Sequence, residues 1–263
     1  MSGLFTPTSM SDLHLPQEIP DHVVDILHDQ IETLRQCCLV SKSWVPRTRK
    51  YLFATVELIT SDDIKRWKKA FPNSSKSPGY HTHTLTVKFP EAITNGAEGE
   101  WITAFSRVVR LEIRDGLELD LARFHRFSGT LKSLRMGLDF GSLLRLFNLI
   151  GSLPLLEDLT LCSSYSNTVG LETFVPSLSS GPALTGILDL YISFTDTAKH
   201  ITSQLLKLPK GIHFRTLKLT WCEEGALDCI TQLVEACSAT LECLGLKYEP
   251  RGANYSVFYW IDH

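Results

Sequence analysis

Two histidines, His81 and His83, have the residue type and spacing of metal ligands. They stand two residues apart in a segment that we predict to be a strand, where alternate side chains point to the same face and two imidazoles can share one metal ion. A zinc site takes three or four protein ligands, and the neighbouring sequence offers no convincing third. We therefore predict no metal site and treat the pair as a solvated strand edge.

A second group of this kind is the triplet Asp139-Phe140-Gly141, which has the letters of the metal-binding triplet of protein kinases. A kinase also needs a glycine-rich loop and an upstream His-Arg-Asp loop, and the sequence contains neither. The serine nucleophile elbow, the P-loop, the dinucleotide fingerprint and the H-E-x-x-H zinc motif are absent as well. The sequence therefore predicts no catalytic residue, no cofactor and no enzymatic activity.

The seven cysteines are an odd number and include no C-x-x-C pair, which is a poor basis for a disulfide framework or a zinc site. Most of them lie in apolar, periodic surroundings, so we expect buried, reduced thiols that act as small hydrophobic residues. The first residues lack a basic segment followed by an apolar one, so we expect no secretory signal. Together these features predict a cytoplasmic or nuclear protein.

The charge balance argues against two classes of partner. The chain has 26 Lys and Arg against 29 Asp and Glu, a net charge of −3, which gives no general attraction to nucleic acid or to acidic membranes. The most apolar stretch, Leu143 to Leu161, is interrupted by Arg145, Glu157 and Asp158 and is not a membrane span. We therefore expect a globular protein that binds neither nucleic acid nor membranes.

Apolar residues at helical spacing fill the segment LPQEIPDHVVDILHDQIETLRQCCLVSKSW, from Leu15 to Trp44. Pro20 is compatible with the first turn of one helix, Thr33 is a candidate cap for a second, and Pro46 marks the start of a third. Three helices this short bury little apolar surface. The bundle therefore needs a neighbour, which is either the rest of the chain or another protein.

This segment resembles an F-box, in particular the F-box-like segments of fungal proteins. The resemblance rests on the ordered anchors LPxEI, TLRxCxLVSKxW and R...LF..V.L between Leu15 and Leu58. It implies docking onto a Skp-family adaptor and, through it, a cullin within a ubiquitin ligase. By position, the adaptor-facing residues would be Leu15, Pro16, Ile19, Leu39, Val40 and Trp44, whereas Leu27, Leu34, Leu52 and Phe53 would form the core of the bundle itself.

The rest of the chain repeats a short strand-like segment seven times. Several copies come close to L-x-x-L-x-L, and helical stripes lie between them, one of which is predicted at Leu227, Ile230, Val234 and Cys237. When the segments are aligned, their central leucines follow one another at intervals of 23 to 29 residues: Leu85, Leu111, Leu134, Leu159, Leu188, Leu217 and Leu244. Alternating strands and helices at this interval resemble a leucine-rich-repeat array, in which the repeats stack to share one core.

The predicted fold is therefore an α/β solenoid, with a three-helix F-box at residues 12–58 and an irregular leucine-rich-repeat array of about seven strand-helix units at residues 59–263. An ordinary doubly wound α/β sheet is the rival interpretation of the same alternation. It would place a glycine-rich turn at a ligand crevice, and the sequence has no such turn.

Residues that alternate with the buried leucines would form the open face of the sheet and hold a target protein. Five of these positions are basic and two are acidic, which favours an acidic or phosphorylated segment of the target. The candidate target-binding residues are Lys88, Arg114, Arg135, Tyr191, Lys218 and Lys247.

Two functions remain open from the sequence. One is a substrate receptor, in which the F-box holds the ligase through the adaptor and the repeats hold an unknown target. The other is a repeat scaffold that acts independently of ubiquitination. Adaptor binding distinguishes them.

Overall fold

The structure is a computed structural model, and it describes residues 16–88, 101–114, 121–137, 143–163, 181–249 and 257–262. The chain divides into two compact units, a helical unit of residues 1–54 and a sheet unit of residues 55–263. The boundary therefore falls after Ala54 rather than after Leu58, because residues 55–58 form a strand of the sheet. Leu15 and the triplet Asp139-Phe140-Gly141 lie outside the described residues.

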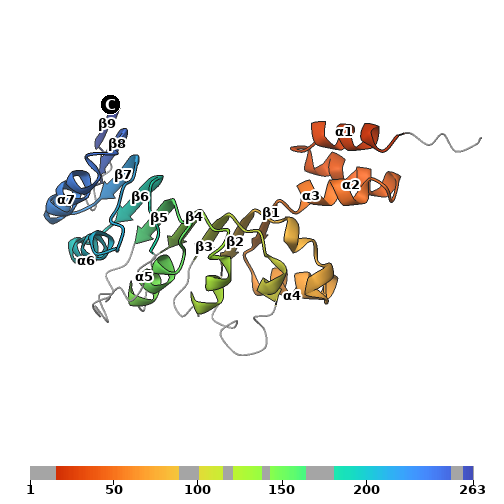
Figure 1. Cartoon of the computed structure of the whole chain (residues 1–263), viewed down its shortest axis with the longest axis horizontal. Coiled ribbons are helices and arrows are strands. Elements are labelled where there is room, and N and C mark those ends of the chain that lie inside the picture. The colour runs from red at the N-terminus through yellow and green to blue at the C-terminus, as the bar shows by residue number, and fades with distance from the viewer. Residues whose placement is uncertain are drawn as a thin grey trace, which may run out of the picture. The chain divides into compact units, whose positions relative to one another are not determined.

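The helical unit contains α1 (Glu18–Ile26), α2 (Ile31–Val40) and α3 (Val45–Leu52) (Figure 1). Pro46 lies in the first turn of α3, where a missing N–H costs nothing. The second helix begins at Ile31, before the predicted cap Thr33, and ends at Val40 rather than at Trp44. The core of the helical unit is small, since the buried side chains of the three helices are Pro20, Val24, Leu34, Cys37 and Thr48.

The sheet unit is one nine-stranded sheet with helices between several of its strands. Its strands are β1 (Thr55–Leu58), β2 (Thr84–Lys88), β3 (Arg110–Arg114), β4 (Ser133–Gly137), β5 (Asp158–Ser163), β6 (Ile187–Ile192), β7 (Thr216–Trp221), β8 (Cys243–Tyr248) and β9 (Val257–Asp262). Its α-helices are α4 (Ser61–Ala70), α5 (Leu143–Gly151), α6 (Thr195–Leu206) and α7 (Leu227–Cys237), and short 3-10 helices include η1 (Ser74–Lys76), η2 (Pro78–His81), η5 (Leu121–Phe127) and η6 (Glu224–Ala226).

The strands follow one another in the sheet in the order in which they occur in the chain. Strands β1 to β8 are parallel, and β9 pairs antiparallel with β8. This order never reverses, so the doubly wound alternative, which requires a reversal, does not describe the sheet. The seven predicted segments are β2 to β8, and their aligned leucines lie side by side in register, which confirms the predicted strand positions.

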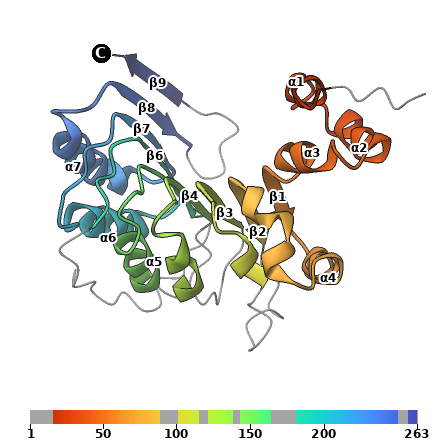
Figure 2. The same ribbon diagram turned by 45° about the vertical axis from the view of Figure 1, so that its right-hand side comes forward.

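Figures 1 and 2 show α4, α5, α6 and α7 on one side of the sheet. The aligned leucines face these helices, and most of them are fully buried, because alternate residues of a strand point to opposite faces. The opposite face, called the open face below, carries the residues between the leucines. In α7 the buried residues are Cys229, Leu233 and Cys237. Cys237 was part of the predicted stripe, whereas Leu227, at the start of that stripe, is 53% exposed.

A hydrogen-bond motif links successive strands where they begin. The carbonyl of the residue just before a strand accepts two consecutive N–H groups from the next repeat, as when the Val109 carbonyl receives Lys132 N at 2.9 Å and Ser133 N at 3.0 Å. The motif fails between β5 and β6, where the Asp158 side chain accepts the Ile187 N–H at 2.9 Å instead. A Cβ at Gly186 would overlap that carboxylate, so a larger residue there would displace the Asp158 side chain from the Ile187 N–H.

Most cysteines behave as predicted. Cys37, Cys222, Cys229 and Cys237 are buried free thiols, and burial raises the pKa of Cys229 and Cys237. Among the described residues, no helix is both long enough and apolar enough to cross a membrane.

Candidate interaction surfaces

The predicted adaptor-binding residues of the helical unit lie largely at its surface. Leu39 is 81% exposed, Val40 is 70% exposed and Ile19 is 49% exposed. Pro16 is exposed and Trp44 is half-buried, while Leu15 lies outside the described residues. Leucine, isoleucine and valine are usually buried in folded proteins, so the exposure of several of them in so small a unit calls for an explanation.

Three further large apolar residues of this unit are exposed and were not predicted from the sequence to bind the adaptor: Val23, Ile26 and Ile31. On α1, Ile19, Val23 and Ile26 are spaced four and three residues apart and form an exposed stripe beside the buried stripe of Pro20 and Val24. At about 100° per residue the two stripes make one apolar arc roughly 160° wide. The width of this apolar arc follows from the sequence alone. A short helix that packs on one small neighbour covers only part of such an arc, so the rest stays exposed.

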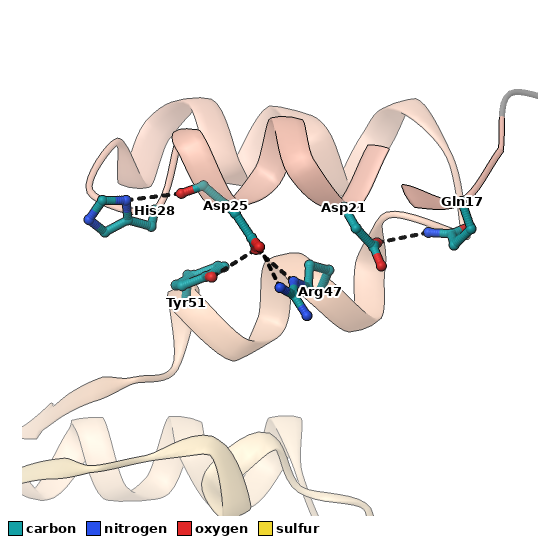
Figure 3. A network of polar contacts seen from close by, with 6 residues as sticks. All are labelled: Gln17, Asp21, Asp25, His28, Arg47 and Tyr51. Atoms are coloured by element: carbon teal, nitrogen blue, oxygen red, sulfur yellow. Dashed lines mark hydrogen bonds and ion pairs between the residues drawn. The ribbon is translucent and has the colours of Figure 1, made fainter. Parts of the chain in front are cut away.

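A polar cluster attaches α1 to α3 on the other side of α1 (Figure 3). The Asp25 carboxylate accepts hydrogen bonds from Arg47, with the Nε contact at 2.6 Å, and from the Tyr51 hydroxyl at 2.8 Å. The Arg47 and Tyr51 hydrogen bonds hold the pKa of Asp25 well below its usual range, and the bond to Asp25 raises the pKa of Tyr51. We call Asp25, Arg47 and Tyr51 the clasp.

The clasp sets which face of α1 remains at the surface. A charge-assisted, two-pronged contact restricts rotation of α1 about its axis more than apolar contacts alone, because its geometry is directional. Gln17 adds a hydrogen bond to Asp21 at 2.9 Å and one to the Ser43 carbonyl at 3.5 Å. With its polar side held on α3, α1 keeps the stripe of Ile19, Val23 and Ile26 at the surface.

The predicted core of the helical unit is only partly buried. Leu34 is fully buried, whereas Leu27, Leu52 and Phe53 are half-buried. The Thr48 hydroxyl donates to the Trp44 carbonyl at 2.7 Å and is buried, so the backbone at Trp44 is tied into α3 while its ring is half-exposed. The unit therefore has fewer core residues than the sequence predicted.

The predicted target-binding residues lie on the open face in two groups. Lys88, Arg114 and Arg135 come from β2, β3 and β4, whereas the second group comes from β6, β7 and β8 and comprises Tyr191, Lys218 and Lys247. Strand β5 lies between the two groups. Its residues Thr160 and Cys162 pair in register with the open-face residues of β4 and β6. The sheet thus brings each group together but does not join the two.

The positive charge of this face is smaller than predicted, because carboxylates lie among the basic groups. Glu112 pairs with Arg114 at 2.8 Å and with Arg135 at 3.7 Å, and Glu249 pairs with Lys247. Glu57 of β1 stands in the same row as Glu112 through Thr86. The open face is thus of mixed charge, and several of its basic residues have an acidic partner beside them.

The two histidines are not on a strand. His81 ends η2 and His83 precedes β2, so the predicted shared strand face does not exist. Within the described ranges no three His, Cys, Asp or Glu side chains are grouped to hold a metal ion.

No protein-family model matches the chain, and no curated protein is significantly similar to it. Any function must therefore be argued from the surfaces of the two units.

Proposed function

We propose that the protein is the substrate-recognition subunit of a Skp–cullin–F-box ubiquitin ligase. In this proposal the helical unit is an F-box that binds a Skp-family adaptor, and the sheet unit is an irregular leucine-rich-repeat solenoid that binds a target protein. The subunit performs no chemistry itself and acts in the cytoplasm or the nucleus.

The observation that carries the proposal is the concentration of exposed apolar side chains on the helical unit. Six large ones lie between Ile19 and Val40: Ile19, Val23, Ile26, Ile31, Leu39 and Val40. Such surface is costly in water unless a partner covers it, at about 25 cal/mol per Å². Half of this set coincides with residues that the F-box resemblance assigns to the adaptor.

The sheet unit supports the second half of the proposal through its topology. Each strand pairs with the next in the chain, and the aligned leucines form one continuous buried row. Stacked repeats of this kind expose one extended sheet face that remains free of helices, which suits binding of a protein.

Titration of a purified Skp-family adaptor into the full chain tests the proposal. The wild-type protein should bind, and Ile19→Ala and Leu39→Ala should each weaken binding by about 2 kcal/mol, or roughly 30-fold, if they are central anchors. The matched control is Leu227→Ala, which removes a similarly exposed apolar side chain, 53% against 49% for Ile19, from the sheet unit. It should leave adaptor affinity unchanged.

Two outcomes count against the proposal. If the wild-type chain does not bind the adaptor, the scaffold alternative, in which the sheet unit acts without ubiquitination, replaces it. If all three variants bind as the wild type does, the exposed surface of the helical unit is not the adaptor site.

A further inference from the structure

Strand β9 forms one edge of the sheet. It pairs with β8 and, over the part of the chain that the structure describes, with no other strand (Figure 2). A strand with a single neighbour presents a row of unpaired N–H and C=O groups along its other edge, and a strand of a second chain can pair with them. The edge of β9 is therefore a candidate interaction surface.

The two edges of the sheet differ in how their sequences oppose such pairing. Strand β1, at the other edge, has only four residues, and one of them is the exposed Glu57. Short strands and charged residues are devices by which proteins protect the edges of their sheets. Strand β9 has six residues, and the five from Val257 to Ile261 include no charged residue and no proline. The edge of β9 thus lacks the protection that β1 has.

A buried apolar row of the sheet reaches the solvent at β9. The row lies on the helix side, two residues after the aligned leucines, and its members on β3 to β7 are at most 4% exposed: Ile113, Met136, Leu161, Leu190 and Leu219. Leu219 pairs with Leu246, and Leu246 pairs with Tyr259, which therefore lies on the same side but is 58% exposed. The last helix among the described residues is α7, which precedes β8, so the helix layer ends before the sheet does. The apolar row therefore ends uncovered at Tyr259.

The sequence of β9 is complementary to itself. Two copies of one strand related by a two-fold axis run antiparallel, and residues at equal distances from the axis lie opposite each other. With the axis at Tyr259, this residue lies opposite its own copy. The flanking positions then pair residues of one kind, Phe258 with Trp260 and Val257 with Ile261. Aromatic pairs stabilise antiparallel strands, and β-branched residues are favoured in them.

We infer that two copies of the chain pair through β9 across a two-fold axis at Tyr259, which joins their sheets into one. A strand of another protein would have to match the apolar pattern of β9, whereas a second copy matches it by symmetry. The two Tyr259 side chains would cover each other at the end of the buried row. The inference concerns the sheet unit alone and stands independently of the proposed function.

Sedimentation velocity of the full chain over a dilution series tests the inference. One pair of short strands is a small interface compared with the roughly 1,600 Å² of a standard one, so the dimer should be weak and depend on concentration. The wild type should shift from its monomer mass of 29.6 kDa to twice that mass as the concentration rises. A wild type that stays monomeric up to about 1 mM, where a Kd of that size would already give a clear dimer, overturns the inference.

Charged residues at position 259 locate the axis. Tyr259→Lys and Tyr259→Glu each place like charges opposite each other in a two-fold dimer, which should raise its Kd by about tenfold. An equimolar mixture of the two variants places opposite charges there and should restore the dimer, which also shows that both variants are folded. The matched control Tyr80→Lys changes another exposed tyrosine of the sheet unit, 45% against 58%, and should leave the Kd within about twofold.

Two further results count against the inference. If the mixture dimerises no better than either variant alone, residue 259 does not meet its own copy. If the dimer persists in both Tyr259 variants, it uses another surface, and Leu39→Ala shows whether that surface lies on the helical unit. Adaptor titration of the Tyr259 variants reports separately on the proposed function, because these substitutions leave the helical unit unchanged.

Discussion

The helical unit and the sheet unit each expose six large apolar side chains among the described residues, but they bury very different amounts of apolar surface. The apolar core of the helical unit is formed by Val24, Leu34 and Cys37, whereas the sheet unit buries an unbroken row of leucines from β2 to β8. Its six exposed apolar side chains are spread from Tyr80 to Tyr259, while those of the helical unit fall between Ile19 and Val40.

This difference distinguishes buried apolar residues that stabilise the fold from exposed apolar residues that are available to bind a partner. In the sheet unit, each strand pairs with the next along the chain, so each added strand enlarges a shared core. The helical unit has no such repetition. Its helix α1 is attached to α3 by the clasp, and only one side of the apolar arc of α1 is buried. The two units should therefore respond differently to the same kind of core substitution.

The largest expected effect comes from truncating the core of the smaller unit. Leu34 and Leu134 are both fully buried, and replacing either by alanine should cost about 2–5 kcal/mol. Leu34→Ala should unfold the helical unit, because a core this small has little stability to spare, and should leave the sheet unit folded. Hydrogen exchange should show loss of protection between residues 18 and 52 alone.

The matched variant Leu134→Ala should weaken the sheet unit and leave the exchange of residues 18–52 unchanged. If either substitution lowers protection equally in both units, they fold as one cooperative structure and the comparison fails.

A smaller effect is expected where the hydrogen-bond motif of the sheet is interrupted. Gly186→Ala pushes the Asp158 carboxylate away from the Ile187 N–H, and loss of an exposed hydrogen bond of this kind costs about 0.5–1.5 kcal/mol. Gly129→Ala is the control, because a Cβ there meets no atom within 4 Å. Urea unfolding of the sheet unit should separate the two variants. Equal stability of the two variants would show that the Asp158 carboxylate does not take the place of a backbone carbonyl as acceptor for the Ile187 N–H.

The clasp should make the stability of the helical unit depend on pH. The pKa of Asp25 is lowered by folding, so its contribution is present above the ordinary carboxyl pKa of about 3.9 and is lost as the pH falls below it. The pKa of Tyr51 is raised, so its contribution is present below the ordinary phenol pKa of about 10 and is lost as the pH rises beyond it.

Amide exchange of α1, measured from acid to alkaline pH and corrected for intrinsic rates, should show greatest protection between these limits. Asp25→Asn keeps the shape of the side chain and should flatten both arms of the profile. An unchanged profile in Asp25→Asn would mean that the clasp does not hold α1 on α3.

The strands of the sheet unit were predictable from the sequence because each repeats the same short pattern, and parallel stacking converts a regular interval into a shared register. The stripe of α7 was misplaced, since Leu227, Ile230 and Val234 compete with Cys229 and Leu233 for the core and only packing decides between them. His81 and His83 were misplaced because Pro78 begins a 3-10 turn that the strand pattern does not reveal.

The functional surfaces were predictable only in part. Ile19, Leu39 and Val40 followed from the F-box resemblance, but Val23 and Ile26 required knowing which flank of α1 its neighbour leaves uncovered. The clasp joins residues 22 and 26 positions apart, Asp25 with Arg47 and Asp25 with Tyr51, and no local period encodes such a pair. The grouping of Arg114 and Arg135 around Glu112 likewise depends on side-chain geometry rather than on spacing.

The smallest expected effect on stability is also the one that bears most directly on the meaning of the exposed surface. Leu39 lies almost opposite the buried face of α2 and is 81% exposed, so Leu39→Asn should change the unfolding free energy by no more than about 0.5 kcal/mol. A residue kept for folding would cost several times that amount. Leu34→Asn, which places an amide at a fully buried position of the same helix, is the contrasting variant and should unfold the unit. If Leu39→Asn is as destabilising as Leu34→Asn, then Leu39 belongs to the fold in solution, and its exposure no longer supports a surface reserved for a partner.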